Sequence, residues 1–269
     1  AVRDAELRRG CPAKVHSAQI CKTHYRMRYE IGCPKVSVLI YAPGQAKGQI
    51  ARTAAGVGNI STYGDLEFLY AESMTGLSDA MQEATGEYIL LLWGGIVPVT
   101  PSFVEELLMF AQRQDVGLCG MQVLDRKDLI FSSDIVVGPA SNMLALEVNR
   151  GMPYDAPGYM GRNYYAHNVS AISGYACMAK KNKLLPLWRQ GSTKSLLARA
   201  LEVCFLLRRQ GRQVVLNPYA LCRASQAGEF SGLSAADAQK LMITYRDQIA
   251  AGDPFYNKNL SLERYWQKR

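Results

Sequence analysis

Apolar and polar positions alternate along the first half of the chain in blocks that are typical of strands followed by helices. Short apolar runs bounded by Pro or Gly predict buried strands at 36–41, 66–70, 88–92 and 116–123. Segments with helical spacing lie between them, at 45–58, 78–85 and 101–112. In the last of these, Pro101 suits a first helical position and Thr100 a cap. The alternation predicts βαβ units and hence an α/β fold with a mostly parallel central sheet flanked by helices.

The second half of the chain has a less regular pattern. Its predicted elements are a strand or hairpin at 128–137, a Gly- and Tyr-rich loop at 151–168, a buried strand at 169–180, a helix at 196–209, a strand at 213–216 and a helix at 235–249. Residues 1–34 are polar and basic, without clear periodicity, and we interpret them as a leader segment that packs on the rest. Residues 35–269 then form one domain. Ligands of such sheets bind beyond the carboxyl ends of the strands, so we expect the site in the loops at 41–45, 71–76 and 93–98.

Composition excludes some classes of protein. The chain is 48% hydrophobic and 20% charged, which is too apolar for a mainly disordered protein. Its most apolar run, at 88–99, is interrupted by Gly and Pro and is shorter than the roughly 20 residues that cross a bilayer. The 7 cysteines include no Cys-x-x-Cys pair, which favours reduced thiols. We therefore expect a cytoplasmic protein, or one at the inner face of the membrane.

Candidate metal ligands also occur near the start of the chain. Their positions are Cys11, His16, Cys21, His24 and Cys33. Their spacing matches no zinc pattern, so we predict no metal site there.

The net charge of +8 is concentrated in one stretch. Between residues 180 and 212 the only acidic residue is Glu202, whereas lysine and arginine recur throughout. Such a stretch could meet a phosphate-bearing ligand, an anionic membrane surface or nucleic acid, or could simply be a solvated helix face. No aromatic interleaving or nucleic-acid motif accompanies the charges, so we expect no nucleic-acid partner and at most peripheral membrane contact.

Eight sequence blocks, taken in order, resemble family-2 glycosyltransferases of the GT-A fold. They are VSVLI at 36–40, GEYILLL at 86–92, TP at 100–101, DVG at 115–117, GMPYDAPGYMGR at 151–162, NVSAISG at 168–174, NPYA at 217–220 and DPFYNKNLS at 253–261. The blocks are similar to the bacterial branch that assembles cell-surface polysaccharides. The resemblance covers nearly the whole chain, including YRMRY at 25–29 in the leader.

The resemblance implies a nucleotide-diphosphate sugar donor and a polysaccharide or lipid-linked acceptor. Family members normally hold Mg or Mn through an Asp-x-Asp motif after the third strand, and the metal neutralises the departing diphosphate. Here Gly94 and Gly95 stand in that place, and glycine has no side chain to ligate a metal. We therefore expect no metal cofactor and impaired catalysis.

Other family positions are carried over residue by residue. On the donor side they are Tyr41, Ala42, Glu72, Ser73 and Trp93, in addition to the two glycines. Trp93 would either fill the donor pocket, stack on a sugar or simply pack. Glu202 is the one acidic residue near the position of the general base.

On the acceptor side the resemblance points to Arg162, Gly174, Tyr175 and Arg223. His167 is a weaker candidate, in a segment similar to the family's acceptor-side stretch. The tyrosines of the 151–168 loop, Tyr154, Tyr159, Tyr164 and Tyr165, would form either an acceptor platform or a small core of the loop.

Two principal functions remain open from the sequence. In one, the chain is an active inverting glycosyltransferase in which basic side chains replace the metal and Glu202 acts as base. In the other, it is a non-catalytic binding or scaffolding module that works beside other glycosyltransferase domains. An unrelated α/β binding protein is a third possibility, and a structure without the expected sheet would favour it.

Overall fold

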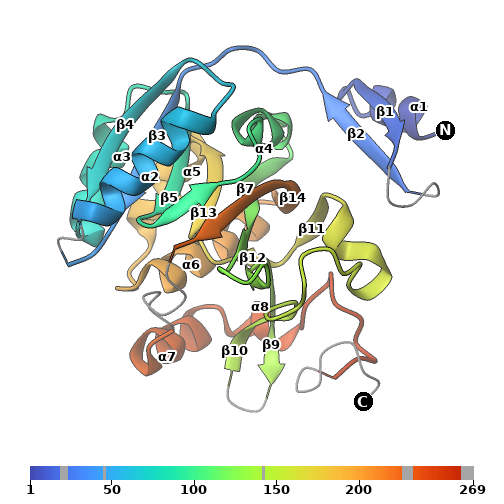
Figure 1. Ribbon diagram of the computed structural model, residues 1–269. Helices are drawn as coiled ribbons and strands as arrows, with labels where there is room; N and C mark the ends of the chain where they lie inside the picture. Colours follow the sequence, from blue (N-terminus) through green and yellow to red (C-terminus); the bar gives the residue numbers. More distant parts are fainter. Residues whose placement is uncertain (19–23, 45–46, 141–142, 226–232, 262–269) are drawn as a thin grey trace.

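The computed structural model describes residues 1–18, 24–44, 47–140, 143–225 and 233–261. Its centre is a large sheet with the strand order β11-β14-β7-β13-β5-β3-β4 (Figure 1). These strands are β3 (Val36–Tyr41), β4 (Leu66–Ala71), β5 (Tyr88–Trp93), β7 (Val116–Leu124), β11 (His167–Val169), β13 (Ala176–Lys180) and β14 (Gln213–Ala224). All six residues of β3 and of β5 are buried, as are all nine of β7. The α/β architecture predicted from the alternating pattern is therefore confirmed.

The sheet is mostly parallel, as expected, but it also contains the antiparallel strands β11 and β13. β4, β3 and β5 are parallel neighbours, as are β7 and β14. β13 lies between β5 and β7 and runs antiparallel to both. β3, β4, β5, β7 and β14 consequently share one direction, and their carboxyl ends meet at one edge. We call this edge, formed by the ends of these five strands and the loops that follow them, the carboxyl edge.

Helices cover both faces of the sheet (Figure 1). α2 (Lys47–Ile60) and α4 (Phe103–Ala111) lie on one face. α3 (Met74–Glu83), α5 (Lys181–Gln190) and α6 (Leu196–Arg209) pack side by side on the other. Leu39, Leu91, Phe103 and Phe205 are among the large side chains that the two layers bury. Burial of apolar area of this kind is the main favourable contribution to folding.

Helix starts follow the local hydrogen bonds. α3 begins earlier than predicted because the Ser73 hydroxyl accepts a hydrogen bond from Gly76 N at 3.0 Å. α6 begins where predicted, and Ser195 caps it in the same way. Thr100 does not cap α4, contrary to our expectation. Its hydroxyl instead faces the backbone of β14 and donates a hydrogen bond to Tyr219 O at 3.0 Å.

The least regular part of the sequence gave the poorest predictions. The segment expected to be one strand at 169–180 contains residues of three strands. β12 (Ala171–Ile172) lies between β11 and β13 in the sequence, but it belongs to a separate sheet. That sheet has the order β10-β9-β12, with β9 (Asp134–Ala140) and β10 (Met143–Glu147), and β8 (Ile130–Ser132) pairs with β7. α5, which contains Pro186, was not predicted. β14 extends to Ala224, well past the predicted 213–216, and pairs there with β6 (Ile96–Pro98).

The first 34 residues contain ordered elements that the sequence pattern did not reveal. α1 (Val2–Arg8) precedes a hairpin of β1 (Ala13–Ser17) and β2 (Tyr25–Tyr29), which lies beside α4 at the upper right of Figure 1. The buried Tyr29 hydroxyl donates to Glu6 Oε2 at 2.9 Å and accepts from Arg113 Nη1 at 2.7 Å. These bonds tie the segment to the end of α4.

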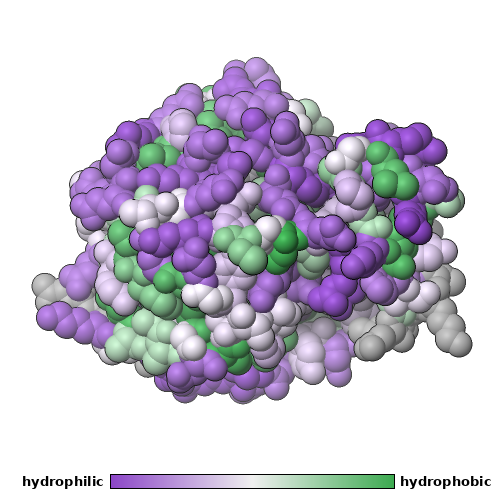
Figure 2. All heavy atoms as spheres, turned by 90° about the horizontal axis from the view of Figure 1, so that it is seen from above, coloured by the Kyte–Doolittle hydropathy of each residue, from purple (hydrophilic) through white to green (hydrophobic). Residues whose placement is uncertain are grey.

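The far end of the chain packs beneath the sheet in the view of Figure 1. α7 (Ala235–Thr244) and α8 (Arg246–Ala250) replace the single helix predicted at 235–249. No helix among the described residues has the length and apolar character to cross a membrane. The face seen from above in Figure 2 is largely hydrophilic, with smaller groups of hydrophobic side chains.

Glu67 offers a test of how β3 and β4 are held to the turn before β5. Its carboxylate accepts hydrogen bonds from Ser37 Oγ, Thr85 N at 2.6 Å and Gly86 N at 2.9 Å. Burial alone would raise its pKa, but these bonds outweigh burial and lower the pKa from 4.5 to about 2. The stabilisation is therefore present above about pH 4.5 and is lost as the pH falls through about 2.

We predict that Glu67→Gln lowers the free energy of unfolding by about 1–2 kcal/mol at pH 7. The difference from the unmodified chain should shrink as the pH falls toward 2, because Glu67 becomes protonated. Urea unfolding followed by circular dichroism between pH 7 and 2.5 measures it. A difference that stays constant over that range would contradict the role given to the ionised carboxylate.

Candidate functional site

A row of rings runs along the carboxyl edge. The Trp93 ring lies at the end of β5, with its centroid 5.3 Å from that of Tyr41 and 5.6 Å from that of Tyr175, edge to face in both cases. Tyr175 in turn approaches Phe131 at 6.2 Å, and the Arg150 guanidinium lies 4.4 Å over the Phe131 ring. Trp93 is only 2% exposed. Its side chain is therefore packed between two strands rather than presented to solvent for stacking on a sugar.

The two glycines after Trp93 are closely surrounded. A Cβ at Gly94 would lie 2.6 Å from the Cβ of Ala42, and a Cβ at Gly95 would lie 2.8 Å from Ser225 Oγ. Gly95 also has a φ of +90°, which side-chain-bearing residues rarely adopt. Backbone bonds fix both, from Gly94 N to Tyr41 O at 2.8 Å and from Gly95 N to Thr53 Oγ1 at 2.8 Å. A side chain at Gly94 would therefore overlap Ala42, and one at Gly95 would need a φ that residues other than glycine rarely adopt.

The implied Mg or Mn site therefore does not fit the residues present. Gly94 and Gly95 offer no ligand, and among the described residues no group of three His, Cys, Asp or Glu side chains is placed to hold a metal ion. Of the five Cys and His positions near the start, Cys21 lies outside the described residues. His24 stacks on Tyr165 with centroids 5.2 Å apart.

Glu72 and Ser73 lie at the carboxyl edge, after β4. Glu72 is exposed there, and it follows Ala71, which pairs with Tyr41 across the sheet. Ser73 caps α3, so its hydroxyl already accepts the Gly76 hydrogen bond. Of this pair, Glu72 keeps the side chain more available for recognising a ligand.

Glu202 occupies a buried position in the contact between α5 and α6. It is 2% exposed, and its Oε2 accepts hydrogen bonds from Thr193 Oγ1 at 2.6 Å, Thr193 N at 3.0 Å and Ser192 N at 2.8 Å. Arg199 Nε lies 3.2 Å away. A general base needs access to an acceptor hydroxyl, and these contacts favour a structural role for the carboxylate instead.

The acceptor-side residues are not all brought together. Gly174 and Tyr175 lead into β13 at the carboxyl edge, where a Cβ at Gly174 would meet the Cβ of Ala200 at 2.7 Å. Arg223 also lies at this edge, on β14, and forms an ion pair with Asp128. Arg162 is held elsewhere, donating to Phe255 O at 2.9 Å and to Asp134 Oδ2 at 3.0 Å.

The tyrosines of the 151–168 loop do not form one platform. Tyr159 packs against the small cluster of Val136, Val148, Tyr256 and Leu260. Tyr165 stacks on His24, as described above, and Tyr164 lines a separate cavity.

Sequence reasoning missed a polar group beside the row of rings. Ser132 Oγ hydrogen-bonds Glu147 and lies 2.8 Å from Ser173 Oγ, while Arg150 Nη1 donates to Glu147 Oε2 at 2.7 Å. Burial raises the pKa of the Glu147 carboxyl. These residues come from β8, β10 and the turn before β13, so no short motif could have linked them.

A second missed group surrounds the fully buried Asp134. Asn149 Nδ2 donates to Asp134 Oδ1 at 2.7 Å, and His167 Nε2 lies 3.8 Å from Oδ2, which is an ion-pair distance rather than a hydrogen bond. Burial alone would raise the pKa of Asp134, but the neighbouring His167 and Arg162 lower it well below its usual range. His167 and Arg162 are thus brought together, around an acidic residue that we had not singled out.

Much of the basic stretch at 180–212 binds backbone carbonyls. Lys181 Nζ donates to Gln82 O at 2.9 Å and Lys183 Nζ to Val116 O at 2.7 Å. Arg212 Nη1 donates to Gln114 O at 2.7 Å. Lys180 pairs across the sheet with Tyr88 at the beginning of β5, so this end of the stretch lies at the edge opposite the carboxyl edge.

Comparisons with known proteins identify the fold. A solved structure described as GalNAc-T7 with UDP, GalNAc and Mn2+ matches with a TM-score of 0.59 and 10% identity, over 88% of this chain and 52% of that chain. No family model matches the sequence. The chain therefore has the GT-A fold of glycosyltransferases, as the sequence blocks predicted.

Two curated relatives are similar over about two thirds of the chain. The O-antigen biosynthesis protein RfbC of Myxococcus xanthus is 24% identical over 188 residues, which cover 68% of this chain. The uncharacterized protein y4gI of Sinorhizobium fredii (strain NBRC 101917 / NGR234) is 24% identical over 198 residues, which cover 69% of it. The matched regions span only 14% and 21% of those proteins.

We predict that Gly94→Ala destabilises the protein by about 1–3 kcal/mol, because the new methyl group would overlap Ala42. Gly58→Ala is the matched control: nothing lies within 4 Å of its Cβ position in α2, so it should gain about 0.5–1 kcal/mol. Urea unfolding at neutral pH compares the two. Equal stabilities would argue against the close packing described for the carboxyl edge.

We predict that Glu202→Ala lowers the free energy of unfolding by about 2–4 kcal/mol, since it leaves the Ser192 and Thr193 amides without their acceptor and Arg199 without its ion-pair partner. Glu83→Ala removes an exposed carboxylate from α3 and should change it by less than about 0.5 kcal/mol. A loss no larger than that of the control would leave the general-base interpretation the stronger one.

Proposed function

We propose that the chain is a family-2-type glycosyltransferase domain of a bacterial surface-polysaccharide biosynthesis protein in which metal-dependent sugar transfer is lost. The observation that carries the proposal is the overlap of a Gly94 side chain with Ala42, together with the positive φ of Gly95, at the two positions that the resemblance aligns with the metal motif. The GT-A fold and the similarity to an O-antigen biosynthesis protein support the class. The sequence blocks support the family.

Electrostatics supports the loss of catalysis. A departing nucleotide diphosphate carries charge that a metal or a set of cations must stabilise, which commonly supplies several kcal/mol. Lys180, Lys181 and Lys183 lie at the opposite edge of the sheet, as described above. At the carboxyl edge the Arg223 charge is paired with Asp128 and Arg126 hydrogen-bonds the Ser225 carbonyl. A nucleotide would have to compete with these contacts.

The domain would then act as a binding or scaffolding module. Its partners would be a polysaccharide or lipid-linked acceptor, or other glycosyltransferase domains of the same assembly, in the cytoplasm or at the inner face of the membrane. The large share of each curated relative that lies outside the matched region is in keeping with such an arrangement.

A second candidate is a metal-independent transferase. The exposed Glu72 carboxylate favours it, because it stands where a carboxylate can recognise the nucleoside, with Arg126 and Arg223 at the same edge of the sheet. In this alternative the two arginines exchange their protein partners for the diphosphate.

Calorimetric titration with UDP, dTDP and GDP, with and without Mn²⁺, separates these functions. We expect no binding tighter than about 1 mM and no enhancement by Mn²⁺. Tight binding that requires Mn²⁺ would overturn the proposed loss of metal chemistry. Tight binding without metal that Glu72→Ala abolishes, and that the control Glu83→Ala retains, would instead establish the second candidate.

A further inference from the structure

The hairpin of β1 and β2 presents a basic face. Its register pairs His16 with Arg26 and Lys14 with Arg28. Residues directly opposite each other on antiparallel strands share a face, and alternate positions along a strand do so too. All four basic side chains therefore lie on one face, while Val15 and Met27 occupy the other.

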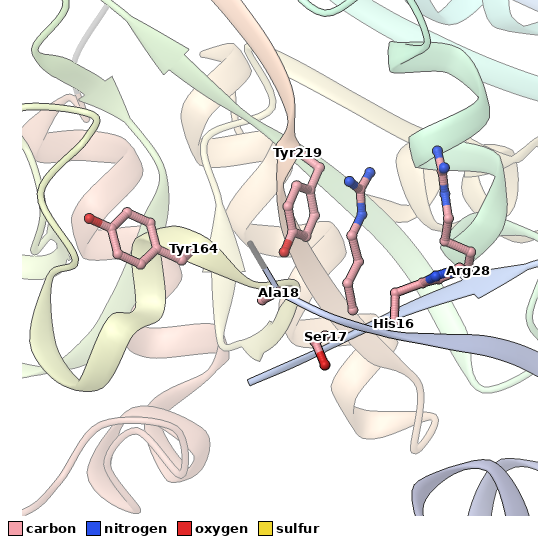
Figure 3. Close-up of a pocket in the computed structure, with 7 residues that line it drawn as sticks. His16, Ser17, Ala18, Arg28, Tyr164 and Tyr219 are labelled. Carbon is pink, nitrogen blue, oxygen red and sulfur yellow. The ribbon is translucent and has the colours of Figure 1, made fainter. Parts of the chain in front are cut away.

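Part of this basic face lines a cavity of about 340 Å³. In Figure 3, Tyr164 lies at the left, His16 and Arg28 of the hairpin lie at the right, and Ala18 and Tyr219 lie between them. Arg26 also lines the cavity, whereas Lys14 does not. The volume is at the small end of ligand pockets and exceeds what an isolated phosphate group needs.

The charges in the cavity wall are unbalanced. Glu106 of α4 is 1% exposed, and its Oε1 accepts hydrogen bonds from both arginines. Arg26 Nη2 is one donor, and Arg28 Nη2, at 3.3 Å, is the other. Among the described residues, Glu106 is the one carboxylate paired with these two guanidinium groups, so one positive charge remains. Arg28 is the more accessible of the two, with 49% of its side chain exposed. Buried Arg26 Nε has no hydrogen-bond partner among the described residues.

Aromatic groups give the cavity a second chemical character. The Arg26 guanidinium lies 3.8 Å over the Tyr219 ring, which keeps the arginine in place. Tyr164 belongs to the short helix at Tyr159–Tyr164, and its hydroxyl bonds Asp155 O, so the ring is anchored from its own loop. Tyrosine rings provide faces for sugar rings and hydroxyl groups for hydrogen bonds.

We propose that this cavity binds a phosphorylated saccharide, with the phosphate on Arg28 and Arg26 and the sugar beside the two tyrosines. Guanidinium groups match phosphate oxygens in a planar, two-pronged geometry, and such charge-assisted bonds are about twice as strong as neutral ones. The site shares no lining residue with the ring row at the carboxyl edge. The inference therefore goes beyond the proposed function and does not depend on it.

Calorimetry of the full chain at fixed ionic strength, with glucose 1-phosphate, inorganic phosphate and glucose as probes, tests the proposal. We expect glucose 1-phosphate to bind with a Kd near or below about 1 mM, phosphate to bind more weakly and glucose not to bind. Glucose binding as tight as that of its phosphate would overturn anion recognition. Phosphate binding as tight as that of the sugar phosphate would overturn saccharide recognition, and no heat with any probe would overturn the site.

A pair of variants locates the binding. Arg28→Gln removes a half-exposed guanidinium from the wall and should weaken glucose 1-phosphate binding roughly tenfold. Lys14→Gln removes the same charge from the same face of the hairpin, outside the cavity. Its Kd for glucose 1-phosphate should stay within about twofold of that of the unmodified chain. Equal losses in the two variants would mean non-specific attraction and overturn the proposal. Thermal unfolding of both variants checks that they fold. The nucleotide titration described under the proposed function probes the carboxyl edge, so its outcome is independent of the outcome of this experiment.

Discussion

The close approach of the ends of β3 and β5 controls the shape of the carboxyl edge. Trp93 fills the space between Tyr41 and Tyr175, and its amide donates to Tyr175 O at 2.8 Å. These contacts hold the ends of β3 and β5 next to the beginning of β13. Gly94 then allows the chain to pass against Ala42 and lead into β6, which pairs with β14 on the far side of the sheet. The contacts that join the two halves of the sheet also leave little space for a side chain at Gly94.

Several charged side chains between residues 180 and 212 hydrogen-bond to the backbone. Lys181, Lys183 and Arg212 satisfy carbonyl groups at the ends of elements, and Glu202 satisfies two amides between α5 and α6. Buried backbone groups without partners are costly, so these contacts are a sufficient reason for a basic stretch that also resembles an anion-binding surface. The net charge of +8 is thus a poor guide to partners when it is taken alone. The uncompensated arginine beside Glu106 is informative because its surroundings define a cavity.

The alternating first half of the chain was predictable because its strands are mainly apolar runs and segments with helical spacing lie between them. The antiparallel entry of β13 was not, since a buried strand reads the same in either direction. α5 was missed because Pro186 argues against a helix interior, although packing between α3 and α6 overrides that local preference. The two glycines at 94 and 95 were visible in the sequence, but the overlap that a side chain at Gly94 would make required the position of Ala42. Asp134 and Glu147 escaped notice because their partners come from distant strands.

The cavity beneath the hairpin is assembled from opposite ends of the sequence. Arg26 and Arg28 come from the second strand of the chain, and Tyr219 from the last. Detachment of the hairpin alone would dismantle the cavity while leaving the large sheet in place, so occupancy is thermodynamically linked to one local opening event rather than to global unfolding. A molecule held there would raise the free energy of that opening by mass action and protect the amides of β2 from exchange with solvent. The local stability of the hairpin would then depend on whether a ligand occupies the cavity.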